Sequence, residues 1–385
     1  MASHAGQNGA PLLDVRGLRT HFELDEGRVR AVDGVDLTVR AGETLCIVGE
    51  SGCGKSVTAR SILQLVERPG WIVAGEVLLR LGPDHQVLTA RHPSRRDRAA
   101  VAAAEDGVLD LAQLDPKGTA VRQIRGRDVA MIFQEPMVSL SPVHTIGHQI
   151  AENIRTHEDV TKRDARDRAI EELRRVGIPR PERRVDAYTF QLSGGMRQRA
   201  MIAMALACRP KLLIADEPTT ALDVTTQAQI LELLQELQAQ SGMAVVFITH
   251  DLGVVAEIAD DVAVMYLGIV AEYCAVDELF HDPRHPYTKA LLESVPRVGR
   301  RARHRLATIT GMVPHPYERP AGCPFHPRCR DAMAELCETT VPPRLATDGS
   351  ASAEVHGGGR SVRCLLYETP EAVRDGTTAR REVRR

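Results

Sequence analysis

Gly49-Glu50-Ser51-Gly52-Cys53-Gly54-Lys55-Ser56 matches G-x-x-x-x-G-K-S, the pattern of a glycine-rich loop that binds phosphate. The apolar run at 44–48 predicts a buried strand before the loop, and a helical segment follows from Val57. Glycines let backbone N–H groups turn toward phosphate oxygens, and the helix N-terminus and Lys55 add positive charge. Ser56 offers a hydroxyl to Mg²⁺. An ordinary glycine turn is the alternative, but the flanking strand and helix favour phosphate binding.

The composition sets limits on the class of protein. The chain has 385 residues, of which 43% are hydrophobic, enough for one large domain with a smaller one or for two ordinary domains. A net charge of −2 and 3% aromatic residues argue against nucleic acid as a partner. Residues 1–10 lack an apolar signal core, and no run of 18 apolar residues occurs. We therefore expect a cytosolic protein that reaches a membrane only through partners.

The N-terminal third predicts strands. Residues 12–22 and 29–39 alternate apolar and polar side chains around Glu26-Gly27, which indicates an antiparallel hairpin, and 71–81 predicts a further strand. From about 83 to 120 the sequence is rich in Arg, Asp, Ala and Gly, and we interpret it as an insertion or a long surface excursion that forms a solvated loop. A basic patch is the alternative, which the acidic residues in the same segment disfavour.

Buried strands and helices alternate through the middle of the chain. Apolar runs of strand length lie at 128–133, 212–215, 244–248 and 262–266, and helices are predicted at 225–240 and 252–258. This alternation predicts an α/β fold with a mostly parallel sheet. A helical block at about 135–192, clearest at 162–176, predicts a separate subdomain.

Polar residues follow the predicted strands. Gln134, Asp216-Glu217 and His250 each come directly after an apolar run, and ligands of doubly wound sheets bind at that edge. Asp216 is placed to hold Mg²⁺, Glu217 to accept a proton from an attacking water, and His250 to contact the γ-phosphate or orient that water. Each residue alone could serve as a cap or a loop polar group, but all of them occurring together favours a site.

A second glycine-rich helix start lies at Leu192-Ser193-Gly194-Gly195-Met196. Ser193 and the free N–H groups after it form an anion site, and an ordinary N-cap is the alternative. Because two glycines at a helix start cost stability, close approach by another group is the better explanation.

These motifs together resemble the ATP-binding subunit of an ABC transporter over nearly the whole chain. The resemblance implies a P-loop ABC-type nucleotide-binding domain with an antiparallel β subdomain and a helical signature subdomain. It implies a D-loop at Asp223, Glu217 and His250 as catalytic residues, and 192–196 acting in trans on a partner's nucleotide. It implies Mg²⁺ held by Ser56, Gln134 and Asp216. The implied nucleotide-binding residues are Phe22 (an adenine-stacking candidate), Gly49, Glu50, Ser51, Gly52, Cys53, Gly54, Lys55, Ser56, Val57 and Gln134.

Shorter stretches at 134–137, 194–204, 285–290 and 322–329 resemble the D-type ATPase of dipeptide and oligopeptide importers. This resemblance implies coupling of ATP hydrolysis to peptide uptake at the cytoplasmic face of the membrane. The implied partners are a second ABC ATPase in a heterodimer, two permease subunits and, indirectly, an extracytoplasmic substrate-binding protein. Nickel or glycoside cargo and a soluble ABC ATPase outside transport are the alternatives. The sequence does not decide which cargo is transported, whether the partner ATPase has a degenerate site, or what the segment 83–120 does.

Four late cysteines form a cluster in sequence. Cys323, Cys329, Cys337 and Cys364 give the ligand count of a zinc or iron–sulfur site, whereas free structural cysteines are the alternative. Resemblance to the peptide-importer ATPases implies a structural [4Fe–4S] cluster.

We expect a disordered N-terminus at 1–10, an ABC ATPase domain at 11–284, a small Cys/Pro-rich C-terminal domain at 285–366 and a disordered tail at 367–385.

Overall fold

The computed structural model describes residues 9–134, 139–220, 222–294, 309–347 and 359–367, so most of the two predicted disordered ends lies outside the described residues. The chain divides into two compact units. Unit 1 consists of Met1–Leu13, Val39–Thr44 and Leu78–Ile248, and unit 2 of Asp14–Thr38, Leu45–Val77 and Thr249–Arg385. Each unit is therefore assembled from segments that are distant in the sequence.

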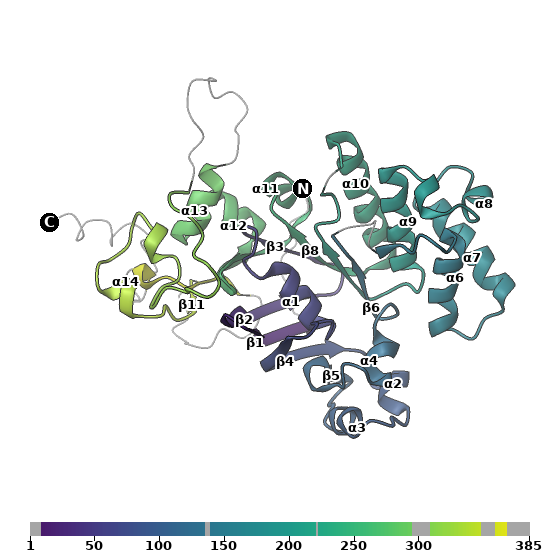
Figure 1. Ribbon diagram of the computed structural model, residues 1–385, viewed down its shortest axis with the longest axis horizontal. Coiled ribbons are helices and arrows are strands. Elements are labelled where there is room, and N and C mark those ends of the chain that lie inside the picture. The colour runs from purple at the N-terminus through teal and green to yellow at the C-terminus, as the bar shows by residue number, and fades with distance from the viewer. Residues whose placement is uncertain (1–8, 135–138, 221, 295–308, 348–358, 368–385) are drawn as a thin grey trace. The chain divides into compact units, whose positions relative to one another are not determined.

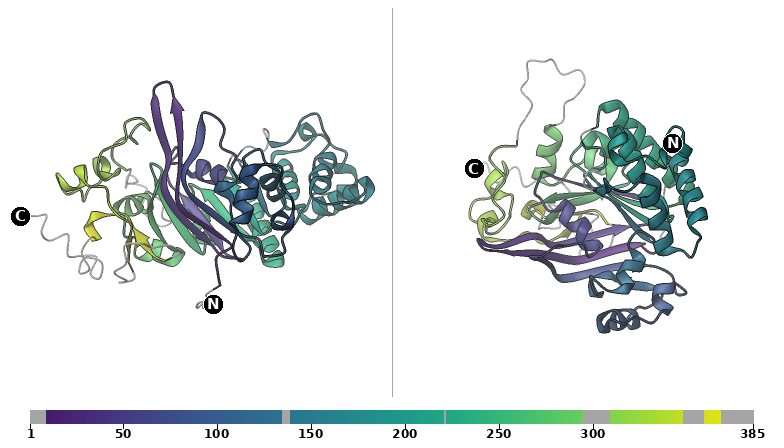
Figure 2. Two further views of the ribbon diagram at one scale, coloured as in Figure 1. Left: turned by 90° about the horizontal axis from the view of Figure 1, so that it is seen from below. Right: turned by 45° about the vertical axis from the view of Figure 1, so that its right-hand side comes forward.

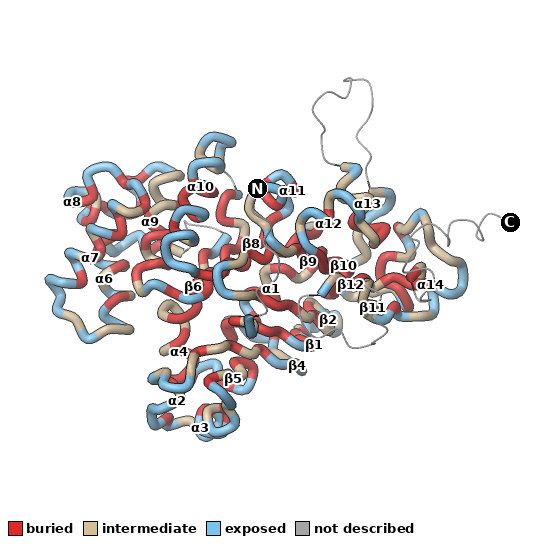
Figure 3. The backbone as a smooth tube through the Cα atoms, turned by 180° about the vertical axis from the view of Figure 1, so that it is seen from behind, coloured by how far each residue is buried: buried red, intermediate tan, exposed pale blue. Residues whose placement is uncertain are grey.

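Unit 1 contains a parallel sheet with the strand order β8-β7-β6. In its register β6 (Val129–Ile132) places Val129 opposite Leu212 of β7 (Leu212–Asp216), which also pairs in parallel with β8 (Ala244–Thr249). Every residue of β7 and β8 is buried, as the red tube of β8 indicates in Figure 3. Strands covered on both faces are continuous apolar runs, so these predictions are confirmed.

Helices α6 to α9 of unit 1 form a bundle beside this sheet (Figure 1), in which α7 packs against both α6 and α9. The buried face of α7 carries Ala165, Ala169 and Leu173, spaced four residues apart as predicted. Thr161 caps this helix by accepting a hydrogen bond from the backbone N–H of Asp164. The bounds are α6 Ile146–His157, α7 Lys162–Arg175, α8 Pro181–Arg184, η2 Thr189–Gln191, α9 Gly194–Leu206 and α10 Val224–Ser241.

The interpretation of residues 83–120 as a solvated loop is wrong. The segment contains α2 (Gln86–Thr89), α3 (Arg95–Ala102), β5 (Val108–Asp110), η1 (Leu111–Gln113) and, at its end, α4 (Thr119–Ile124). Asp97 is fully buried, and its carboxylate accepts hydrogen bonds from the backbone N–H groups of Asp115 (2.9 Å) and Ala120 (3.3 Å). Short helices leave no clear periodicity in the sequence. The charged residue Asp97 is here a buried hydrogen-bond acceptor that joins separate backbone segments.

The N-terminal strands of unit 2 follow the prediction. β1 (Leu13–Leu24) and β2 (Gly27–Val39) are long neighbouring strands joined by a two-residue turn, and they are the purple pair on the left of Figure 2. β4 (Gly70–Arg80) lies on the other side of β1. The last residues of β4, from Leu78 onward, pair with β5 in unit 1.

The second sheet of unit 2 has the order β11-β12-β10-β9-β3. β3 and β9 are parallel, whereas β9, β10, β12 and β11 pair antiparallel. The strands are β3 Thr44–Val48, β9 Asp261–Tyr266, β10 Ile269–Ala275, β11 Leu345–Ala346 and β12 Ser361–Val362. The helices are α1 Lys55–Ile62, α11 Leu252–Ile258, α12 Val276–His281, α13 Pro286–Glu293, η3 His326–Arg328, α14 Leu336–Thr339 and η4 Leu365–Tyr367.

The C-terminal segment adds strands to the sheet of unit 2. Val362 of β12 lies opposite Glu272 of β10, so residues far apart in sequence share one sheet. A small separate C-terminal domain at 285–366 is therefore not confirmed. β10 is buried except at its last residue, Ala275, and lies beside β12 (Figure 3).

Candidate functional site: a phosphate loop, a Gln–Glu pair and an exposed helix start

The phosphate loop lies in unit 2 between β3 and α1, as predicted. Gly49, Gly52 and Gly54 have φ values of 151°, 78° and 101°, a region that side chains rarely adopt. A Cβ on Gly49 would lie 2.2 Å from the carbonyl oxygen of Met265, and a Cβ on Gly54 would lie 2.2 Å from that of Ala31. The loop glycines are therefore required both by backbone conformation and by close packing.

Lys55 is the first residue of α1 and is almost fully buried, with 6% of its surface exposed. Its Nζ donates hydrogen bonds to the carbonyl oxygens of Gly49 (2.8 Å) and Glu50 (3.1 Å), so the ammonium group lies over the loop. Cys53 is buried beneath it, and burial raises the pKa of its thiol. The side chain of Cys53 thus packs inside the loop, while the cation at Lys55 is the group suited to neutralise phosphate charge.

The other loop residues differ in exposure. Ser51 is exposed, whereas Ser56 and Val57 are half-buried in the first turn of α1. Glu50 faces the C-terminal segment: its N–H donates to the hydroxyl oxygen of Tyr287 (2.9 Å), and its carboxylate accepts two hydrogen bonds from Arg328. Sequence reasoning missed both partners because no local pattern links positions more than 200 residues apart.

Phe22 is half-buried near the end of β1 in the same unit. Its ring lies against Gly70 of β4, where a Cβ would come within 2.5 Å of Cε1. The ring therefore has a defined position, and its role in stacking on adenine stays a prediction.

In unit 1, two predicted site residues meet at the end of the parallel sheet. Glu217 directly follows β7, and its Oε2 accepts hydrogen bonds from Nε2 of Gln134 (3.1 Å) and from the hydroxyl of Thr220 (3.0 Å). Glu217 has a φ of 46°, which is uncommon for a residue with a side chain and is held by a hydrogen bond from its N–H to the carbonyl oxygen of Ile248 (3.0 Å). The fold thus holds this carboxylate in one place.

The two neighbouring candidates are placed differently. Asp216, the last residue of β7, is 1% exposed, whereas His250 is exposed and directly follows β8. Asp216, Gln134 and Glu217 belong to unit 1, while the phosphate loop and His250 belong to unit 2. Their convergence around one nucleotide stays a prediction.

The signature segment begins α9 in unit 1, as predicted. Ser193 is the N-cap, and its hydroxyl oxygen accepts a hydrogen bond from the N–H of Met196 (3.4 Å). Apart from its chain neighbours and the backbone of its own helix, no heavy atom of the described residues lies within 4 Å of a Cβ built on Gly194, whereas one on Gly195 would lie 3.1 Å from Cγ2 of Thr226. Space is therefore open at Gly194 and closed at Gly195.

Asp223 caps the neighbouring helix α10. Its carboxylate accepts hydrogen bonds from the N–H (3.0 Å) and the hydroxyl (2.7 Å) of Thr226, and these bonds lower the pKa of Asp223. The predicted D-loop residue therefore has a structural function at this helix start, and a role between subunits stays a prediction.

The four late cysteines come together in unit 2. Cys323 donates its backbone N–H to the carbonyl oxygen of Cys337 (2.8 Å). Burial raises the pKa of Cys329 and of Cys364 to about 12. Nearby late cysteines also raise these pKa values, Cys323 and Cys337 for both thiols and Cys329 for Cys364. Within the described residues, no group of three or more His, Cys, Asp or Glu side chains is arranged to hold a metal ion.

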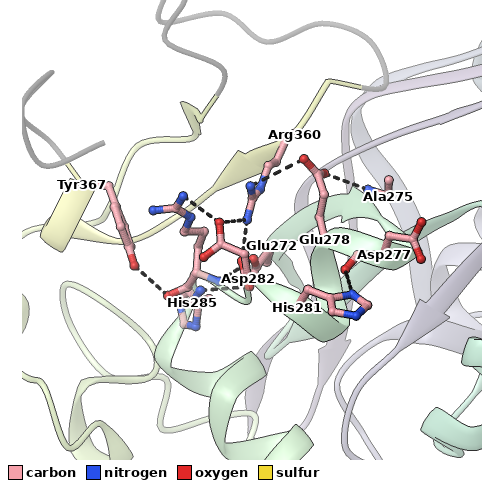
Figure 4. Close-up of polar contacts among 10 residues, drawn as sticks. Glu272, Ala275, Asp277, Glu278, His281, Asp282, His285, Arg360 and Tyr367 are labelled. Atoms are coloured by element: carbon pink, nitrogen blue, oxygen red, sulfur yellow. Dashed lines mark hydrogen bonds and ion pairs between the residues drawn. The ribbon is translucent and has the colours of Figure 1, made fainter. Parts of the chain in front are cut away.

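A polar network fixes the segment that leads into α13 (Figure 4). Glu272 is buried, and its two carboxylate oxygens accept hydrogen bonds from the backbone N–H groups of Arg284 (2.7 Å) and His285 (2.8 Å). Burial raises the pKa of Glu272 and lowers that of His285 to about 4. Arg360 pairs with Glu278 and Asp282 in the same network. The C-terminal segment is thus anchored where α13 begins.

No helix in the part of the chain that the structure describes is both long and apolar enough to cross a membrane.

Comparison with known proteins gives two family matches and close relatives. Residues 32–220 match the model of the ABC transporter, and residues 271–337 match that of the oligopeptide/dipeptide transporter, C-terminal region. The dipeptide transport ATP-binding protein DppD of Haemophilus influenzae is 47% identical over 345 residues, covering 90% of this chain and 95% of that protein. The oligopeptide transport ATP-binding protein AppD of Bacillus subtilis is 46% identical over 358 residues, covering 93% and 97%.

Solved structures agree with these matches. The dimeric structure of MJ0796, a bacterial ABC transporter cassette, has a TM-score of 0.54 and 26% identity, and the match covers 69% of this chain and 98% of that one. The same cassette bound to ADP and Pi in a post-hydrolysis state has a TM-score of 0.55, with 26% identity and the same coverage, 69% and 98%. The predicted cassette fold is therefore confirmed.

Proposed function

This chain belongs to the ATP-binding subunits of ABC transporters that import peptides, and we propose how its residues perform that function. The chain is an ATPase whose cofactor is Mg²⁺, and it works with membrane permease subunits. Residues 49–57 bind the phosphates of ATP, Lys55 neutralises charge on the β- and γ-phosphates, and Glu217 accepts the proton of the attacking water.

The observation that carries this proposal is the Gln134–Glu217 pair at the end of β7. A hydrogen bond from Nε2 of Gln134 holds Oε2 of Glu217 at 3.1 Å, so that carboxylate is already oriented. An oriented base within reach of water is what hydrolysis requires, because the phosphoryl transfer itself depends on positioning and charge stabilisation. His250 then contacts the γ-phosphate or orients the water.

The donor atoms at the site suit Mg²⁺. Ser56, Gln134 and Asp216 would hold the ion, since a hydroxyl, an amide oxygen and a carboxylate are the oxygen ligands that it prefers. The ion supplies further neutralisation of the phosphate charge when it is bound.

The signature residues 192–196 complete the site of a partner ATPase, so we expect a heterodimer of ATPases on two permeases at the cytoplasmic face of the membrane. An extracytoplasmic substrate-binding protein delivers the cargo. The open space at Gly194 supports this, because a helix start without a covering side chain can approach a nucleotide held by another subunit.

We also propose that Cys323, Cys329, Cys337 and Cys364 hold a [4Fe–4S] cluster that stabilises the C-terminal segment. Support comes from the proximity of the four thiols, because the Cys364 thiol lies close enough to Cys323, Cys329 and Cys337 to interact with their charges. Anaerobic purification followed by iron and acid-labile sulfide analysis tests it. We expect about four of each per chain; zinc without sulfide, or no metal in a folded chain, would overturn the proposal.

Glu217→Gln in the assembled transporter tests the assigned base. Loss of the carboxylate should lower ATP hydrolysis by roughly 10²-fold or more, while ATP binding is retained. Glu236→Gln is the matched control, because Glu236 is exposed on α10 and its change also removes one negative charge. Near-wild-type turnover in Glu217→Gln would remove it from the catalytic role.

A further inference from the structure

Glu50, the first variable residue of the phosphate loop, is held from outside the loop. Two hydrogen bonds join the guanidinium of Arg328 to its carboxylate, Nη1 to Oε2 at 2.6 Å and Nη2 to Oε1 at 2.9 Å. The backbone N–H of Glu50 donates to the hydroxyl oxygen of Tyr287 at 2.9 Å. Both the main chain and the side chain of Glu50 are therefore anchored to the C-terminal segment.

The contact with Glu50 also balances the charge of Arg328, which is buried. Its side chain is only 4% exposed, and Glu50 is the carboxylate that it pairs with. Its Cζ also lies 5.8 Å from the centroid of the Tyr266 ring, and the bond to Glu50 raises the pKa of Arg328. A parallel, two-bond pair with a buried guanidinium is a directional contact, and removing one partner leaves the other charge buried and unbalanced.

The turn that carries Arg328 is held in place by a backbone hydrogen bond and by aromatic packing. Arg328 ends the single turn η3, whose backbone donates from Arg328 to the carbonyl oxygen of Phe325 at 3.0 Å. The Phe325 ring packs against Tyr266 and Tyr287, with centroids 5.2 and 5.3 Å apart. Two residues hold Glu50. Tyr287 belongs to this buried cluster of aromatic rings, and Arg328 packs on the Tyr266 ring of the same cluster.

We propose that Arg328 and Tyr287 are positioning residues for ATP binding, which they support by fixing Glu50 and with it the phosphate loop. The proposal rests on the proposed function of the loop in binding ATP. Three glycines in left-handed conformations make the free loop costly to order, and an external anchor at Glu50 reduces the conformations that ATP must select. The C-terminal segment is thus part of the nucleotide site without touching the nucleotide.

The test compares Arg328→Met with Arg330→Met in the full chain. Arg330 also carries one positive charge, but it pairs with Glu293 at the surface, with 63% of the Arg330 side chain exposed. A fluorescent Mg–ATP analogue titrated into the chain gives Kd, and ATPase kinetics of the assembled transporter give KM and kcat. Arg328→Met should raise Kd and KM about tenfold, with a smaller change in kcat, whereas Arg330→Met should leave all three unchanged.

Conservative variants separate positioning from simple loss of stability. Arg328→Lys keeps the charge but loses the two-bond geometry, so it should restore part of the affinity. Tyr287→Phe removes a single hydroxyl and should raise Kd about threefold; it decides the matter if Arg328→Met does not fold. In a double-mutant cycle, Glu50→Gln combined with Arg328→Met should cost less affinity than the sum of the two single changes.

An unchanged Kd in folded Arg328→Met or in Tyr287→Phe would overturn the proposal, as would strictly additive effects in the cycle. A lower melting temperature together with unchanged affinity would likewise assign Arg328 to stability alone. Failure of the proposed function is distinguishable, because it would appear in the wild-type chain as absence of ATP binding or hydrolysis, before any variant is compared.

Discussion

The starts of helices α1 and α9 both carry glycines, and the two starts are built in different ways. At α1, Gly54 is the N-cap with a φ of 101°, offers no side-chain cap and packs against the backbone of Ala31. At α9, Ser193 caps the helix in an ordinary extended conformation, and Gly194 faces open space. The first start is enclosed by its own chain, whereas the described residues of unit 1 leave the second uncovered at Gly194.

The two glycine-containing helix starts are therefore suited to two different functions. An enclosed loop with Lys55 folded over it can bind phosphate within one subunit. An uncovered helix N-terminus still carries partial positive charge, but it needs an anion brought by something else. We infer that the chain contributes a binding half and a completing half to two separate sites.

A change at the enclosed start of α1 should reduce activity most. Lys55→Ala removes the ammonium group that lies over the loop, and ATP turnover in the assembled transporter should fall roughly 10²-fold or more. Lys162→Ala, at the exposed first position of α7, is the control with the same change of charge. Retained turnover in Lys55→Ala would show that the loop is not the catalytic phosphate site.

A smaller effect is expected at the uncovered start. Gly194→Asp has room for its side chain, and an acidic residue in a first helical turn is favourable, so the variant should fold. Its charge would repel a partner's phosphate, and hydrolysis by the assembly should fall about tenfold. Kd for the fluorescent ATP analogue in the isolated chain should stay within about twofold of wild type. A loss of binding in the isolated chain would mean that Gly194 serves its own subunit's site.

The smallest effect concerns the stability of the segment that anchors the loop. Burial lowers the pKa of His285 to about 4, below its ordinary value of 6.5. As pH falls from 7.5 to 5.5 the unfolded chain takes up a proton that the folded chain does not, so stability falls. The contribution is about 1.4 kcal/mol over this range. Urea unfolding followed by the fluorescence of Trp71, the single tryptophan, reports on unit 2.

His285→Gln should lose this increment of acid sensitivity. Glu272, whose raised pKa acts with the opposite sign, is present in both proteins, so the difference between them isolates the histidine. An equal fall in stability for wild type and His285→Gln would contradict the assignment.

Local patterns in the sequence predicted the elements that local physics determines. Buried parallel strands such as β7 and β8 are unbroken apolar runs, and Ser193 was recognisable as a cap before a helix. The Gln134–Glu217 contact was predictable in kind, because residues that follow neighbouring parallel strands emerge at the same edge.

The failures have a common physical origin in long-range contacts. The fold of residues 83–120 depends on the buried carboxylate of Asp97, which a charge pattern presents as a surface residue. The pairing of β12 with β10 and the contact of Arg328 with Glu50 join positions whose local sequence carries no sign of the partner. Such pairings depend on tertiary structure, which composition and periodicity do not encode.

The division between the two helix starts can be tested by comparing ATP hydrolysis by the isolated monomeric chain with hydrolysis after assembly with its partner ATPase and permeases. The monomer should bind Mg–ATP at one site, because its phosphate loop is complete, but it should turn ATP over at least about tenfold more slowly than the assembly. Full hydrolysis by a chain shown to be monomeric by light scattering would contradict the division between an enclosed binding half and an uncovered completing half.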